Sequence, residues 1–167
     1  MPSTDALLAE IPRLRRYARA LTGDATRADD LVQDTLERAL NKWRLWRPGN
    51  LRNWLLTTMH HVFINQLATE HRLQYRDAAE LPDIPVAPAQ GDGLALRDLG
   101  RALQALPADQ REILLLVGLE DLSYEETARI VGIPPGTVMS RLSRARGRLR
   151  GLLAEGETLP AHLKIVK

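Results

Sequence analysis

The sequence contains no cysteine, which excludes disulfide scaffolds, thiolate metal sites and cysteine nucleophiles. Aromatic residues make up only 4%, and no β-branched stretch alternates with polar residues, so an all-β fold is disfavoured. The longest apolar run, Ile113–Val117, is five residues long, far short of the roughly 20 that span a bilayer. The first residues have neither the basic nor the apolar region of a secretory signal. These absences predict a soluble, cytoplasmic, all-α protein.

Proline and glycine concentrate in residues 77–93, which hold three prolines, two glycines and no basic residue. This stretch has no helical period, so it cannot bury enough apolar surface to offset its ordering entropy. We therefore predict two small helical domains, residues 1–76 and 94–155, joined by a flexible acidic linker. Residues 156–167 are predicted to form a C-terminal tail.

In the first domain, apolar residues spaced four and three positions apart predict a helix from Leu7 to Leu21 that Gly23 ends. A second helix is predicted to start at Thr26, and a third to run from about Leu51 to Arg72. Opposite the apolar face of the second helix lies an acidic stripe, which comprises Asp30, Gln33, Asp34 and Glu37. Such a stripe is usually solvated surface, and it also suits docking to a basic partner.

The second domain contains a helix-turn-helix pattern. Ser123 and Glu126 form a capping box at the start of a short helix, Gly132 lies in the turn, and Pro135 suits the first turn of the next helix. The outward face of that helix comprises Thr137, Ser140, Arg141, Ser143, Arg144 and Arg148. Residues 139–150 carry five arginines and no acidic residue, so DNA binding is favoured over a merely solvated face.

A second basic block lies in residues 42–54, where tryptophans alternate with cationic and amide side chains. Trp43 and Trp54 are best read as core residues. The polar members suit phosphates and unpaired bases of single-stranded nucleic acid; they are Arg44, Arg47, Asn50 and Arg52. His60 and His71 lie about 16 Å apart on a helix, too far to share an ion, so we expect no metal site. No catalytic constellation or phosphate-binding loop is present, so we expect neither an enzyme nor a cofactor.

Four segments together resemble a known family. Ala28–Thr35 resembles the core-binding segment of region 2 in bacterial extracytoplasmic-function (ECF, group IV) sigma factors. Leu106–Glu112, Ser123–Ala128 and Gly132–Arg146 are similar to region 4 of the same family. The resemblance covers roughly residues 8–152, with both regions in the family's order.

The resemblance implies a protein that binds RNA polymerase core and directs it to promoters. The stripe of Asp30, Gln33, Asp34 and Glu37 would dock on the β′ clamp helices, and region 4 on the β flap. A segment from Arg44 to His61 would capture and melt the −10 element, and its candidate contacts are Arg44, Arg47, Asn50, Arg52, His60 and His61. The recognition helix would bind the −35 element, although Met139 stands where the family usually has a basic residue. The family further implies an anti-sigma factor, with the chain monomeric when free or 1:1 in that complex.

Two other classes remain as alternatives. An autonomous helix-turn-helix repressor or activator would use the first domain for sensing or dimerisation, because such proteins usually read two half-sites as dimers. An enzyme is the third class, and it has no visible catalytic set in its favour. Transcription with purified core polymerase distinguishes the first two classes, since a sigma factor is nearly inert on DNA without polymerase.

Overall fold

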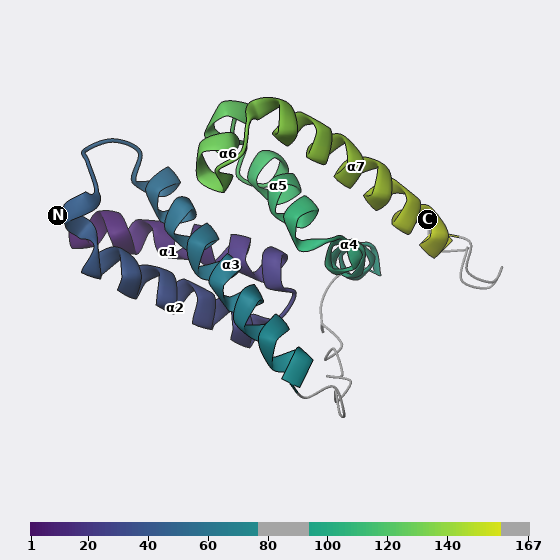
Figure 1. The fold of residues 1–167 in the computed structure, drawn as a ribbon, viewed down its shortest axis with the longest axis horizontal. Helices are drawn as coiled ribbons and strands as arrows, with labels where there is room; N and C mark the ends of the chain where they lie inside the picture. The colour runs from purple at the N-terminus through teal and green to yellow at the C-terminus, as the bar shows by residue number, and fades with distance from the viewer. Residues whose placement is uncertain (77–93, 158–167) are drawn as a thin grey trace.

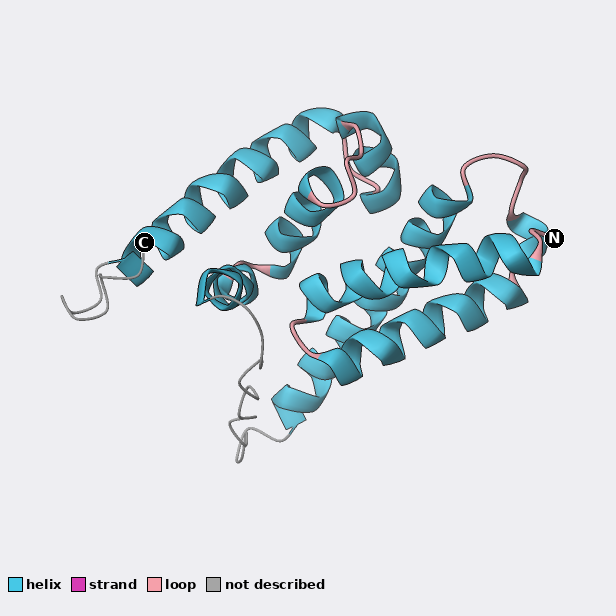
Figure 2. Ribbon diagram, turned by 180° about the vertical axis from the view of Figure 1, so that it is seen from behind, coloured by secondary structure: helices cyan, strands magenta, loops and turns pink. Residues whose placement is uncertain are grey.

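The computed structural model describes residues 1–76 and 94–157. These residues form seven α-helices and one 3-10 turn, and they include no strand (Figures 1 and 2). The expected all-α fold is therefore confirmed. The predicted linker, residues 77–93, and residues 158–167 of the predicted tail lie outside the described residues. None of the helices described is both long and apolar enough to cross a bilayer.

The first domain contains α1 (Thr4–Thr22), α2 (Ala25–Asn41), the 3-10 turn η1 (Trp43–Leu45) and α3 (Leu51–Arg76). Gly23 ends α1 in the left-handed conformation at φ 72°, as the sequence predicts. The predicted start of the second helix at Thr26 is wrong. Asp24 is the N-cap, because its carboxylate accepts a 2.8 Å hydrogen bond from the Thr26 amide.

The second domain contains α4 (Leu94–Ala105), α5 (Ala108–Gly118), α6 (Tyr124–Val131) and α7 (Pro135–Glu157). The capping box at the start of α6 is confirmed: Ser123 accepts from the Glu126 amide at 3.1 Å, and the Glu126 carboxylate accepts from the Ser123 amide at 2.9 Å. Gly132 ends α6 in the left-handed conformation, and α7 begins at Pro135. A helix-turn-helix of α6 and α7 results.

The two domains share one hydrophobic core. Buried side chains of α1, α2 and α3 lie in the same cluster as Leu103, Leu106, Leu115 and Leu116 of the second domain. Helix α6 packs against α3, whereas α4 and α5 pack against α1 (Figure 1). A smaller cluster within the second domain comprises Ile113, Ala128, Val138 and Leu142, and it holds the helix-turn-helix together. The sequence predicts that these apolar faces are buried, but their spacing does not reveal which helix covers each one.

Candidate functional site

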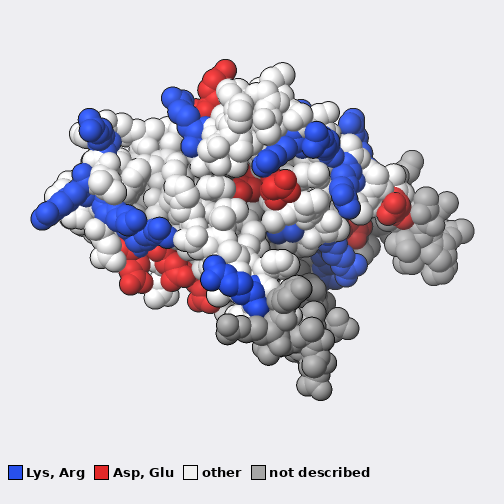
Figure 3. Space-filling view, in the orientation of Figure 1, with Lys and Arg blue, Asp and Glu red and all other residues white. Residues whose placement is uncertain are grey.

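The acidic stripe lies on the solvent side of α2. Asp30, Gln33, Asp34 and Glu37 are all exposed, and the opposite face of the helix buries Leu31. Acidic side chains gather over α2 along the lower edge of the molecule (Figure 3). Within the described residues, only Asp34 of this stripe has a hydrogen bond, accepted at 3.0 Å from Gln66. The stripe is thus a largely unengaged anionic surface that a cationic partner can reach.

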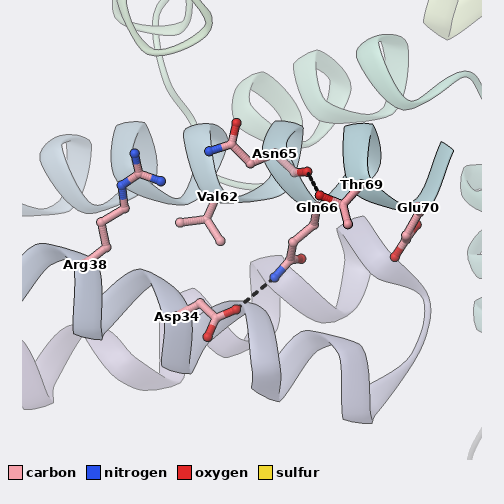
Figure 4. A pocket seen from close by; sticks show the side chains of 7 residues that line it. All are labelled: Asp34, Arg38, Val62, Asn65, Gln66, Thr69 and Glu70. Atoms are coloured by element: carbon pink, nitrogen blue, oxygen red, sulfur yellow. Dashed lines mark hydrogen bonds between the residues drawn. The ribbon is translucent and has the colours of Figure 1, made fainter. Parts of the chain in front are cut away.

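A polar groove of about 430 Å³ continues this surface between α2 and α3 (Figure 4). Its lining residues are Asp34, Arg38, Val62, Asn65, Gln66, Thr69 and Glu70. Glu70 also pairs with Arg27 at 2.6 Å, so its carboxylate joins α3 to the start of α2. The groove's α3 side was not predicted as part of the site. Its available signal is the pair of polar positions, Asn65 and Gln66, repeated one turn later at Thr69 and Glu70.

The loop that joins α2 to α3 carries three of the predicted nucleic-acid contacts. Arg44, Arg47 and Asn50 are all exposed. The Arg44 guanidinium lies 5.8 Å from the centroid of the Trp43 ring. Asn50 also has a local structural role, because its side-chain oxygen accepts a 3.1 Å hydrogen bond from the Asn53 amide at the start of α3. Trp54 packs against the hydrophobic core, whereas Trp43 is half-buried outside that cluster.

Two other predicted contacts face the second domain instead of solvent. The Arg52 guanidinium donates a 3.1 Å hydrogen bond to the Glu120 carbonyl. His60 pairs through Nδ1 with the Glu112 carboxylate, and its side chain is only 11% exposed. Their neighbour Asn53 donates to the Glu126 carboxylate at 3.2 Å. Arg52 and His60 therefore belong to an interdomain contact that sequence reasoning did not anticipate.

His61, the remaining predicted contact on α3, stays exposed beside His60, with 5.5 Å between the ring centroids. Partial burial lowers the pKa of His61, and the positive charges of His60, Arg38 and Lys42 lower it further. A neutral imidazole at this position can both donate and accept a hydrogen bond, which suits contact with a base edge.

Glu120, in the turn between α5 and α6, is a buried carboxylate that the sequence analysis also missed. Its side chain is 0% exposed and lies 3.4 Å from Arg13 Nε and 3.9 Å from Arg16 Nη2, both on α1. Burial raises the pKa of Glu120, against the opposing effect of nearby arginines. Nothing in the local pattern marks this residue, because it follows an apolar helix as an ordinary surface acid would.

The recognition helix α7 has the predicted orientation. Val138, Leu142 and Ala145 are buried, and basic side chains follow the helix on its outer side (Figure 3). The residues of the candidate DNA face are all at least partly accessible: Thr137, Ser140, Arg141, Ser143, Arg144 and Arg148. Ser140 Oγ donates to the Thr137 carbonyl at 3.1 Å, which holds its hydroxyl against the helix.

One expectation about the arginine run is wrong. Arg141 has an acidic partner from outside the run, because its Nε lies 3.9 Å from the Asp109 carboxylate on α5. Arg144 and Arg148 are exposed, and neither has an ion pair within the part of the chain that the structure describes. These two guanidinium groups are therefore the most available cations of the helix-turn-helix.

The comparisons with known proteins agree with this arrangement. Residues 7–60 match the family described as "Sigma2 domain of PhyR", and residues 96–149 match "Sigma-70, region 4". The chain is 42% identical over 159 residues to the ECF RNA polymerase sigma factor EcfG of Rhodopseudomonas palustris, covering 92% of this chain and 88% of that protein.

Solved structures extend the similarity to three dimensions. The sigma factor RpoE of Bartonella quintana, in complex with the anti-sigma factor NepR, superposes with a TM-score of 0.78 and 40% identity over 90% of this chain and 95% of RpoE. CnrH, in complex with the cytosolic domain of CnrY, superposes with a TM-score of 0.67 and 25% identity over 90% of this chain and 86% of its own. The chain therefore belongs to the family of ECF RNA polymerase sigma factors.

Proposed function

We propose that this protein binds RNA polymerase core and directs it to promoters, with one DNA-contacting surface in each domain. The observation that carries this proposal is the combination, in a single chain, of an unengaged acidic stripe on α2 and a helix-turn-helix whose outer face is basic. An autonomous repressor has use for the second feature only. The first needs a cationic protein partner, and the family supplies one in polymerase.

The acidic stripe is the proposed docking surface for the β′ clamp helices. Its four residues, Asp30, Gln33, Asp34 and Glu37, are exposed and almost free of structural hydrogen bonds, so a partner can displace only water. Complementary charge at such a surface raises the association rate and fixes the orientation of docking. The second domain is proposed to contact the β flap.

The proposed −35 contacts are the outward residues of α7, namely Thr137, Ser140, Arg141, Ser143, Arg144 and Arg148. Residues near the N-terminus of a recognition helix reach base edges, while later arginines meet phosphates. The proposed −10 contacts are Arg44, Arg47, Asn50, Arg52, His60 and His61. Arg52 and His60 can serve in this way only after the second domain leaves α3.

We also propose a 1:1 complex with an anti-sigma factor in the cytoplasm, with the free chain a monomer. The support is the likeness to RpoE, whose structure contains the anti-sigma factor NepR. No cofactor or catalytic role is part of the proposal.

Transcription from a template library tests the proposal. Purified bacterial core polymerase is incubated with the chain and with templates whose −10 and −35 positions are randomised, and the transcripts are sequenced. We expect initiation that depends on the chain and that enriches one −35 and one −10 sequence. Absence of chain-dependent transcripts, together with tight binding of a dimer to duplex DNA, would establish the repressor alternative instead.

A further inference from the structure

We propose that the free chain is self-inhibited: the second domain covers α3 with an acidic face that occupies the cations intended for promoter DNA. This inference rests on the proposed function, because it concerns the same −10 surface. The acidic face comprises Glu112, Glu120 and Glu126, and the groups it engages on α3 are Arg52, Asn53 and His60.

The contacts lie along one side of α3. Arg52 and Asn53 contact the turn before α6 and its first residues, while His60, about two helical turns further on, pairs with Glu112 of α5. Between them, Leu56 and Met59 are buried in the core that the two domains share. The second domain is therefore seated on the helix face that carries these predicted DNA contacts.

The acidic face resembles a nucleic acid in its chemistry. It presents carboxylate and carbonyl oxygens to a guanidinium, an amide and an imidazole, which are the groups that bind phosphates and bases. Two further arginines of the first domain, Arg13 and Arg16, meet the Glu120 carboxylate. A DNA strand cannot reach Arg52 or His60 while these oxygens are in place, and their negative charge would repel its phosphates.

The closed arrangement is also poised to separate. Both carboxylate oxygens of Glu120 are buried and have no hydrogen bond within the described residues, and their ion pairs are long at 3.4 and 3.9 Å. A buried charge with incomplete hydrogen bonding weakens the assembly that contains it. Apolar residues such as Leu106 and Leu115 oppose separation, because opening would expose them to water. A partner that holds the two domains apart is therefore needed to keep the chain open, and core polymerase has that chemistry under the proposed function.

A reversible crosslink tests the inference. The chain has no cysteine, so Asn53→Cys with Glu126→Cys places thiols only at one interdomain contact. A short bis-maleimide with an internal disulfide then holds the domains closed, and a reductant releases them in the same molecules. We expect the bridged chain, with excess core polymerase, to form promoter complexes at least tenfold more weakly than the released chain. The promoter is the one recovered from the template library, and each single-cysteine variant carrying the same reagent is a matched control.

The outcomes separate this inference from the proposed function. Equal promoter binding by the bridged and released chains would overturn self-inhibition, while transcription by both would leave the proposed function intact. The stripe on α2 stays exposed in the closed arrangement, so the bridged chain should still co-elute with core. Loss of that co-elution on bridging would also overturn the inference, because closure would then act on polymerase docking. Failure of wild type and released chain alike to support transcription would count against the proposed function itself.

A second variant removes one contact without a crosslink. Glu112→Gln leaves His60 without its anionic partner, and we expect promoter complexes with core to form at severalfold lower concentration than with wild type. Glu125→Gln is the matched control, because Glu125 is an exposed residue of α6 with no contact to α3 among those described. Far-ultraviolet circular dichroism verifies that both variants remain helical. An unchanged promoter affinity in folded Glu112→Gln would refute the role of the His60–Glu112 pair.

Discussion

The guanidinium of Arg111 on α5 donates a 2.9 Å hydrogen bond to the carbonyl of Leu21 on α1, ninety residues earlier in the chain. The same group donates to the carbonyls of Leu103, Gln104 and Leu106, at 2.8, 3.2 and 2.9 Å respectively. These acceptors lie at the C-terminal ends of α1 and α4, where helix carbonyls have no partner within the helix. One side chain therefore completes two helix ends and joins the two domains.

Replacing Arg111 should destabilise the protein more than replacing any exposed arginine. Arg111→Met leaves four carbonyls without this donor, and we expect the free energy of unfolding to fall by about 3 kcal/mol. Arg111→Lys should recover only part of that loss, because an ammonium group lacks the planar fork that reaches several acceptors. Urea denaturation measures both variants. Arg101→Met, at an exposed position of α4, is the control, and full recovery by lysine would contradict the multiple-acceptor role.

Charge reversal on α2 tests polymerase docking. Asp30→Arg combined with Asp34→Arg should leave the helices intact, since both side chains are exposed. Like charges would then meet at the proposed contact with the clamp helices, so holoenzyme formation should weaken at least tenfold, about 1.4 kcal/mol or more. Co-elution with core polymerase measures the effect. The matched control is Asp98→Arg on α4, and a folded double variant that binds core as wild type does would refute the docking role.

The −10 role can be tested at Arg47, which is exposed in the loop before α3. Arg47→Ala should weaken open-complex formation more than closed-complex binding, because the side chain is proposed to hold the displaced strand. Templates with a pre-melted −10 element should restore part of the defect, since base unpairing requires a few kcal/mol that such templates no longer need. Permanganate footprinting reports melting, and Arg72→Ala at the far end of α3 is the control. Equal defects on duplex and pre-melted templates would contradict strand capture.

The buried carboxylate of Glu120 predicts a pH dependence of stability. Burial raises its pKa above the ordinary value of 4.5, so the folded state binds this proton more tightly than the unfolded state does. The corresponding stabilisation is present below the ordinary pKa and is lost as the pH rises through the raised one. Glu120→Gln carries no such proton, so its stability relative to wild type should increase from about pH 4 to about pH 7. Urea denaturation across that range measures the difference, and a constant difference would contradict the direction of the shift.

Local elements were predictable because their signals are local. The capping box of Ser123 and Glu126, the left-handed Gly23 and the start of α7 at Pro135 each depend on neighbouring residues only. The interdomain contact was not predictable, because its partners are far apart in sequence: 52 positions separate His60 from Glu112, and 73 separate Asn53 from Glu126. Apolar spacing identifies a face that is buried but not the helix that buries it. Arg52 and His60 were consequently expected on a free surface, where their side-chain chemistry alone would place them.

The recognition helix offers a direct separation of base contacts from phosphate contacts. Val138 and Leu142 face the domain core, so Ser140 and Arg144 lie on the side that a major groove would meet, and Arg148 follows one turn later. Arg144→Ala should reduce affinity for the preferred −35 sequence by about 1–3 kcal/mol and relax discrimination among variants of that sequence. Arg148→Ala, its matched control on the same exposed face, should weaken all sequences alike and lower the salt dependence by about one counterion. Competition binding across −35 variants at several salt concentrations distinguishes the two effects, because a lost base contact changes the ranking of sequences whereas a lost phosphate contact does not. A uniform loss of affinity in Arg144→Ala would assign this arginine to the phosphate backbone instead.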